Sequence, residues 1–422
     1  MLKRLLPLTA AVAAGFLLAQ YAARHPGAPS WWPDRDRDRN VRYFRDVLQT
    51  VRENYVDPAK ADYDGLTRTA LKGMLSELDP HSEFLTAEEF RQNEDDLSNG
   101  FDGVGIQVEQ RDNRIVVITP IAGTPAERAG IRRGDQLVKV DGRPLENATV
   151  QKTVGLIRGR PDTEVVLTMY RPALDRSLDF RLKRERIQLA SVRRVSLQSG
   201  GIGYLQITQF SERTGAEFAG ALAELEKRGL RALVIDMRNN PGGLLDAAIE
   251  VCSEFFDHNE LIVYTQGRSS ESRDNRLAEG SHPRRAYPVA ILVNGGTASA
   301  AEIVAGAMRD TRRAVIVGEK TFGKGLVQTV IELKNGEGLR LTTARYYTPS
   351  GISIHEKGIQ PAVELEIAAD DEAKLRLQQS REDLVPPKEF AERYGFPPIE
   401  DVQLNAATEI LTGLLARPGA KP

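Results

Sequence analysis

From residue 200 to residue 318 the sequence alternates short apolar runs with segments of helical spacing, and this pattern constrains the fold more than any other feature. Apolar runs separated by helical segments favour a mainly parallel sheet that is covered by helices. The expected strands are residues 201–210, 232–238, 288–294 and 313–318, and the expected helices are residues 214–229, 244–256 and 299–310. The sequence therefore predicts an α/β core, and in such sheets sites gather at the carboxyl ends of the strands.

Three short motifs follow expected strands of this sheet. They are "RNNPGG" at 238–243, "GGTASAAEIV" at 295–304 and "GEKTFGKGLVQ" at 318–328. Because parallel neighbours present their carboxyl ends at one edge of a sheet, we expect these three segments to lie close together. This edge is the predicted functional site.

Ser299 stands at the start of the helix expected over 299–310 and has two interpretations. It is either a helix-capping residue or a nucleophile, and a serine nucleophile needs a base within hydrogen-bond reach. Of the five histidines, His355 in "SGISIHEKG" is the one whose place along the chain fits such a role. A serine–histidine pair with His355 therefore stays open as an alternative.

Lys324 is the other candidate base, because its loop follows the next expected strand after the serine. A lysine base must be neutral, and lowering its pKa from ~10.4 to about 8 requires roughly 3.3 kcal/mol. Burial alone supplies shifts of that size, and Phe322 and Leu326 give this loop an apolar setting. Gln328 would hold the amine in place without a charge, whereas a carboxylate there would raise the pKa of the lysine.

An acyl-transfer site also needs two N–H groups aimed at the developing oxyanion. The first N–H groups of a helix have no partner within the helix, so the backbone of Ala300 is one candidate donor. Glycine lets a backbone approach closely, which makes Gly243 of "NNPGG" the second candidate, with Gly242 as its alternative.

Residues 99–185 change to short alternating strands, glycine turns and two short helices. The strands are expected in 103–110, 113–120, 135–142 and 164–171, and the helices in 124–130 and 149–159. Gly103 and Gly105 allow successive N–H groups to point into one concavity that binds an anionic group. With a strand beside it, the expected guest is a peptide C-terminus; a small sandwich without a ligand is the alternative.

The N-terminus combines Lys3 and Arg4 with an uncharged apolar stretch of 19 residues, 5–23. This pattern is typical of a secretory signal peptide, and its length also suffices to span a bilayer. No small-residue cleavage motif ends the stretch, so residues 1–23 are interpreted as a signal peptide or a membrane anchor, with a buried helix as the third alternative. Proline and alternating charge predict a solvated stalk over 24–39, which places the remainder outside the cytoplasm.

The composition excludes several classes of function. A net charge of −2 without a long basic stretch gives no indication of nucleic-acid binding. The single cysteine, Cys252, excludes an intramolecular disulfide and a cysteine-based metal cluster. No metal or cofactor is expected. Helical spacing predicts helices in 40–98 and in the last part of the chain, 369–422.

Taken in order, "LVIDMRNNPGG", "NGGTASAAEIVAGAMRD" and "GEKTFGKGLVQ" resemble the motifs of the carboxyl-terminal processing peptidases, also called tail-specific proteases. The resemblance runs from "YFRDVLQTVRENYVDP" to "RYYTPSG". It implies that Ser299 is the nucleophile, Lys324 the base and Gln328 its support. Thr297 and Ala301 stand where that family commonly has serines, so local hydrogen bonding is expected to differ.

The segment "GVGI" (Gly103, Val104, Gly105 and Ile106) resembles the carboxylate-binding loop of a PDZ domain, with the helix near 149–157 as the other wall of the groove. The resemblance implies a crotonase-like α/β protease core over residues 186–368 and an inserted PDZ domain over residues 99–185, which precedes that core in the sequence. It also implies an extracytoplasmic serine endopeptidase, in the periplasm or cell envelope, that reads the C-termini of protein substrates.

A homo-oligomer is expected as well, and activation by an adaptor or lipoprotein stays open. Two alternatives belong to other classes. One is a non-catalytic PDZ adaptor on a protease-like core, and the other is a crotonase-type thioester enzyme.

Overall fold

The computed structural model describes residues 35–111, 114–121, 123–145, 149–269, 271–280, 284–381 and 387–416. The chain divides into two compact units, with the boundary in the sequence between Pro80 and His81. The predicted signal peptide or anchor and residues 24–34 of the predicted stalk lie outside the described residues.

The first unit contains helices α2 (Arg35–Asn54) and α3 (Tyr63–Ser76). The Asp62 side chain caps α3 by accepting the N–H of Gly65 at 2.7 Å. Because α2 begins at Arg35, the end of the predicted stalk is helical. Among the described residues, no helix combines the length and the apolar character needed to cross a membrane.

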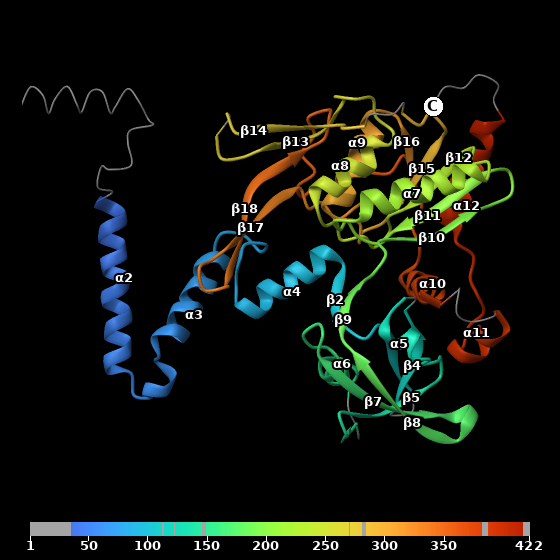
Figure 1. Ribbon diagram of the computed structural model, residues 1–422. Coiled ribbons are helices and arrows are strands. Elements are labelled where there is room, and N and C mark those ends of the chain that lie inside the picture. The colour runs from blue at the N-terminus through green and yellow to red at the C-terminus, as the bar shows by residue number, and fades with distance from the viewer. Residues whose placement is uncertain are drawn as a thin grey trace, which may run out of the picture. The chain divides into compact units, whose positions relative to one another are not determined.

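The centre of the second unit is a six-stranded sheet in the order β10-β11-β12-β15-β16-β19 (Figure 1). Its strands are β10 (Val192–Leu197), β11 (Ile202–Ile207), β12 (Ala232–Asp236), β15 (Val289–Val293), β16 (Ala314–Gly318) and β19 (Val363–Glu364). All neighbours from β11 onward are parallel, and β10 is antiparallel to β11. The mainly parallel sheet predicted from the alternating pattern is confirmed.

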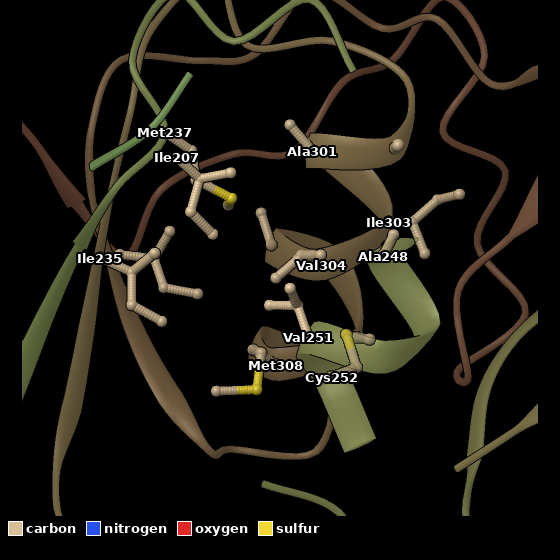
Figure 2. Close-up of a cluster of buried hydrophobic side chains, with 14 of the residues drawn as sticks. Ile207, Ile235, Met237, Ala248, Val251, Cys252, Ala301, Ile303, Val304 and Met308 are labelled. Carbon is tan, nitrogen blue, oxygen red and sulfur yellow. The ribbon is translucent and has the colours of Figure 1, made fainter. Parts of the chain in front are cut away.

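Helices cover both faces of this sheet. Side chains from alternate positions of the strands pack against α7 (Thr214–Lys227), α8 (Leu245–Ser253) and α9 (Ala300–Asp310) in one buried cluster. Figure 2 shows part of it, with Ile235, Val304 and Met308 gathered between the sheet and the helices. The intervening positions pack against α12 (Val402–Leu415) in a second cluster that includes Tyr204, Val234 and Leu411. The three helices expected between the strands and the C-terminal helix are present.

A second sheet of five antiparallel strands was not predicted. It has the order β1-β18-β13-β14, with β17 also paired to β18. The strands are β1 (Glu83–Leu85), β13 (Leu261–Gln266), β14 (Arg273–Leu277), β17 (Leu326–Glu332) and β18 (Gly338–Tyr347). Helix α4 (Ala87–Ser98) follows β1 and begins with a capping box, in which the Thr86 N–H donates to the Glu89 carboxylate at 2.8 Å and the Glu89 N–H donates to the Thr86 hydroxyl at 3.3 Å.

The PDZ-like module forms a separate sheet in the order β3-β4-β5-β7-β8, with β6 paired to β5. Its strands are β3 (Ile106–Arg111), β4 (Arg114–Pro120), β5 (Gln136–Val140), β6 (Arg143–Pro144), β7 (Glu164–Arg171) and β8 (Arg176–Lys183). The short helices are α5 (Pro125–Arg128) and α6 (Val150–Ile157). A two-stranded ribbon of β2 (Gly100–Gly103) and β9 (Glu185–Gln188) leads the chain in and out of the module. All four strands expected here are confirmed.

Candidate active site

Ser299 occupies the N-cap position of α9 in a rare backbone conformation, with φ 54° and ψ −118°. A non-glycine residue with positive φ is strained, and such strain persists only where the surroundings hold it, often at functional sites. Here the Ser299 N–H donates to the Glu302 carboxylate at 2.9 Å, and its carbonyl oxygen accepts the N–H of Ile303 at 3.1 Å. Ser299 both caps the helix and lines a cleft, so the capping role does not exclude a nucleophile.

The glycine loop after β12 packs closely against Ser299. A Cβ on Gly242 would lie 2.7 Å from the Ser299 Cβ and 2.9 Å from the Ala300 nitrogen. A Cβ on Gly243 would lie 2.0 Å from the carbonyl oxygen of Phe210, and both glycines have positive φ (98° and 136°). Only glycine fits at these two positions.

The N–H groups of Gly242 and Gly243 differ in whether they donate a hydrogen bond within the protein. The N–H of Gly242 donates to Asn240 Oδ1 at 2.9 Å. In the described part of the chain, by contrast, the N–H groups of Gly243 and Ala300 have no hydrogen-bond acceptor. An oxyanion hole requires two such preorganised donors, so the geometry favours Gly243 over Gly242.

Lys324 lies in the loop between β16 and β17 and lines the same cleft as Ser299. Its ammonium donates to Gln328 Oε1 at 3.4 Å, and the Gln328 amide in turn donates to the backbone carbonyl of His81 at 2.9 Å. Burial lowers the pKa of Lys324 from its ordinary value. Within the described ranges, no hydrogen bond joins Lys324 Nζ to the Ser299 hydroxyl.

Glu302 connects the two loops that carry the serine and the lysine, and sequence reasoning did not identify it. Its carboxylate is fully buried, and its Oε2 accepts the N–H groups of Ser299 and Lys324 at 2.9 and 2.8 Å. Its Oε1 accepts the N–H of Gly323 at 2.8 Å and the hydroxyl of Thr321. One carboxylate therefore fixes the backbone of both loops. Only its place three residues after Ser299, as in a capping box, could have drawn attention to it.

The cleft around Ser299 has a volume of about 370 Å³ and a largely apolar wall. The apolar side chains come from α4, from β17 and β18 of the antiparallel sheet, and from the segments that follow β11 and β12. They are Leu97, Phe210, Pro241, Leu244, Leu245, Leu326, Val327, Val330 and Tyr346. Lys324 and Arg340 are the charged side chains among the described residues of the lining.

The structure places His355 away from the lining of this cleft. A Cβ on Gly325 would lie 2.3 Å from the backbone nitrogen of His355, so the histidine lies behind the lysine loop. Its Nδ1 is buried without a hydrogen-bond partner in the described part of the chain. His81 contributes its carbonyl oxygen, His258 is exposed, and His25 and His282 lie outside the described residues. The geometry therefore favours Lys324 as the base.

The glycine segment of the PDZ-like module lies at the start of an edge strand. Gly103 ends β2, Val104 is fully buried, Gly105 has φ 77° and Ile106 begins β3. The N–H groups of Val104 and Gly105 donate to no other described residue. Strand β3 pairs with β4 along one side only, and α6 contacts it. Two amides without acceptors among the described residues, an edge strand and a helix are thus brought together.

Comparison with protein families gives two matches. Residues 201–365 match Peptidase family S41, and residues 116–171 match the PDZ domain. The chain is 38% identical over 403 residues to the carboxy-terminal-processing protease of Bartonella bacilliformis, a match that covers 91% of each chain. It is 39% identical over 330 residues to the carboxy-terminal processing protease CtpA of Bacillus subtilis, with 78% of this chain and 69% of the relative covered.

The fold is similar to a solved structure from Bacteroides fragilis that is described as an S41 protease. That match has a TM-score of 0.50 and 19% identity, and it covers 91% of this chain and 99% of the other. The extent and identity of the sequence matches establish the family. The chain belongs to peptidase family S41, the carboxy-terminal processing proteases, and is a serine-type hydrolase with a PDZ domain.

Proposed function

We propose that the protein is an endopeptidase that uses a Ser299–Lys324 dyad to cleave protein substrates near their C-termini. The observation that carries this proposal is the convergence around one cleft of a strained serine, a half-buried lysine and two amides that have no acceptor among the described residues. No metal or cofactor takes part in the proposed reaction.

In the proposed reaction neutral Lys324 accepts the Ser299 hydroxyl proton as the oxygen attacks the scissile carbonyl carbon. The N–H groups of Gly243 and Ala300 stabilise the oxyanion of the tetrahedral intermediate. The lysine then delivers its proton to the leaving amine as the peptide bond breaks. In the second half of the reaction neutral Lys324 accepts a proton from water as the water oxygen attacks the acyl-enzyme carbonyl carbon, and it returns that proton to the Ser299 oxygen as the ester bond breaks. Lys324 needs to approach Ser299 for the first step, and substrate in the cleft would bring about that approach.

Gln328 keeps the amine of Lys324 in place while adding no charge. Its amide is itself held by the His81 carbonyl, which leaves Oε1 free to accept from the lysine. No carboxylate is among the described residues that line the cleft, and burial lowers the pKa of Lys324, which favours the neutral amine that a base requires.

The PDZ domain is proposed to bind the substrate tail. The amides of Val104 and Gly105 would hold the terminal carboxylate, and the tail would add as a strand to the open edge of β3, between Gly103–Ile106 and α6. Tail binding in this domain would then control cleavage at Ser299.

The proposal includes the wider organisation of the chain. The proposed domains are the PDZ domain over residues 99–185, a crotonase-like protease core over residues 186–368, and flanking regions over residues 40–98 and 369–422 that are mainly helical where the structure describes them. Residues 1–23 direct the protein out of the cytoplasm as signal or anchor, so its substrates are proteins of the periplasm or cell envelope. Self-association and an activating protein partner remain part of this proposal.

The test uses the full chain and an unstructured protein substrate with either a free or an amidated C-terminus. We expect the wild type to cut the free form, to cut the amidated form at least tenfold more slowly, and Ser299→Ala to cut neither. Cleavage that ignores the amide would contradict tail recognition, and cleavage by Ser299→Ala would contradict the dyad.

A further inference from the structure

The loop that carries the proposed oxyanion donor is held at its other end by the C-terminal helical region. The loop follows β12, which ends at Asp236, and runs through Arg238 to Gly243. The Arg238 side chain is 6% exposed, and its partners are the fully buried Asp236 and the N-cap residue of α12, Asp401. A buried charge in such a place is tolerated only when its partners are arranged closely around it.

The contacts of Arg238 are close and complementary. Its Nη1 and Nη2 donate to the two Asp401 oxygens at 2.9 and 2.7 Å, a bidentate pair. Its Nε and Nη2 donate to the two Asp236 oxygens at 3.0 and 2.7 Å, and Nη1 also donates to Gln403 Oε1 at 3.1 Å. The Tyr204 hydroxyl completes the network by donating to Asp236 Oδ2 at 2.9 Å.

The other residues of the loop transmit this attachment to the serine turn. Asn240 donates to the carbonyl oxygen of Ile207 at 2.8 Å and accepts the Gly242 N–H, and its own carbonyl accepts the N–H of Ala298 at 2.9 Å. The loop is thus a short, hydrogen-bonded connection between the guanidinium of Arg238 and the backbone beside Ser299.

We infer that Arg238 and Asp401 are positioning residues for catalysis, because their ion pair fixes the oxyanion loop to the start of the C-terminal helix. Neither side chain lines the cleft, so the pair acts through the position of the Gly243 amide. The inference rests on the oxyanion role proposed for Gly243. The C-terminal helix α12 lies outside the three sequence motifs, but on this inference it contributes to the rate of the chemical step through the position of Gly243.

The test compares Asp401→Asn with the wild type in the full chain. Asparagine caps a helix as well as aspartate does, so α12 keeps its N-cap while the ion pair with Arg238 is lost. Arg285→Lys is the matched control, because Arg285 forms a partly buried ion-pair cluster with Glu226 and Glu254 before β15, at the opposite end of the strands.

We expect Asp401→Asn to lower kcat at least tenfold with KM within about twofold of the wild type, since misplacing an oxyanion donor affects the transition state more than the bound substrate. The rate of Ser299 labelling by a fluorophosphonate, whose tetrahedral oxygen occupies the same hole, falls in parallel. Arg285→Lys changes neither rate. Thermal unfolding of each variant verifies that it is folded at the assay temperature.

If Asp401→Asn does not fold, Gln403→Met removes one acceptor from Arg238 and is expected to lower kcat by a smaller factor, about threefold. Unchanged kcat and labelling in a folded Asp401→Asn, or in a folded Gln403→Met where that variant is needed, would overturn the inference. Activity in Ser299→Ala would instead overturn the proposed function, so the two failures are distinguishable.

Discussion

Replacement of Gln328 by glutamate tests whether a lysine is the base. The side chain keeps its length and an oxygen toward the ammonium, which lies 3.4 Å from Oε1 in the wild type, but it loses the hydrogen bond that the Gln328 amide donates to the His81 carbonyl. The added charge stabilises the protonated lysine, so the pKa of Lys324 rises and a higher pH is needed before the amine is neutral. The acid limb of the pH–rate profile is therefore expected to move to higher pH.

The size of the shift follows from the distance. At 3.4 Å two unit charges attract by about 5 kcal/mol at an effective dielectric constant of ~20 and by about 1.2 kcal/mol in bulk water. At ~1.36 kcal/mol per pKa unit these limits correspond to roughly 3.6 and 0.9 units. Lys324 is half-buried, so the shift lies between them, at about one to three units.

The assay is the pH dependence of kcat/KM for the wild type, Gln328→Glu and Gln328→Met. In the wild type we expect activity to rise with pH and to level off below the ordinary lysine range, because burial lowers the pKa of Lys324. The methionine variant removes the hydrogen bond without adding charge and separates lost positioning from electrostatics. An acid limb that does not move in a folded Gln328→Glu variant would refute lysine as the base.

Three further substitutions test the site. Gly243→Ala places a Cβ 2.0 Å from the Phe210 carbonyl oxygen, so we expect kcat to fall about 100-fold or more. Gly229 also has positive φ but has open space around it, so Gly229→Ala is expected to leave kcat unchanged. Equal kcat values in the two variants would contradict the oxyanion role of the Gly243 loop. Glu302→Gln turns an amide donor toward two backbone N–H groups. We expect urea titration to show a loss of unfolding free energy on the order of 1–3 kcal/mol, and kcat to fall at least tenfold. A variant as stable and active as the wild type would refute the role of Glu302 in holding both loops. Gly105→Val places a Cβ 2.3 Å from the Thr124 Cβ and is expected to raise KM about tenfold for substrates with a free C-terminus only. An equal rise in KM for amidated substrates would contradict binding of the substrate tail by this loop.

The parallel sheet and its functional edge were predictable from sequence because their determinants are local. Each strand is an apolar run such as "VAILV" bounded by turn residues, and the helix after Ser299 begins beside glycines. The proximity of the three motifs follows from the rule that parallel strands present their carboxyl ends at one edge of a sheet. The structure places Gly243, Ser299 and Lys324 around one cleft.

The antiparallel sheet and the residues that hold the loops were not predictable in the same way. Strand β18 mixes polar and apolar residues at most positions and pairs with β1, more than 250 residues earlier in the chain, so no local pattern marks it. Glu302 and Asp401 act through backbone amides and a distant guanidinium. The Arg238–Asp401 pair joins residues 163 positions apart, a contact that only the fold creates.

The most direct test of the Ser299–Lys324 dyad is to identify the residue that a fluorophosphonate modifies in the full chain. We expect a single adduct on Ser299, absent in Ser299→Ala, and formed much more slowly in Lys324→Ala at neutral pH. An adduct on another residue, or labelling of Ser299 at the wild-type rate without Lys324, would contradict the proposed dyad.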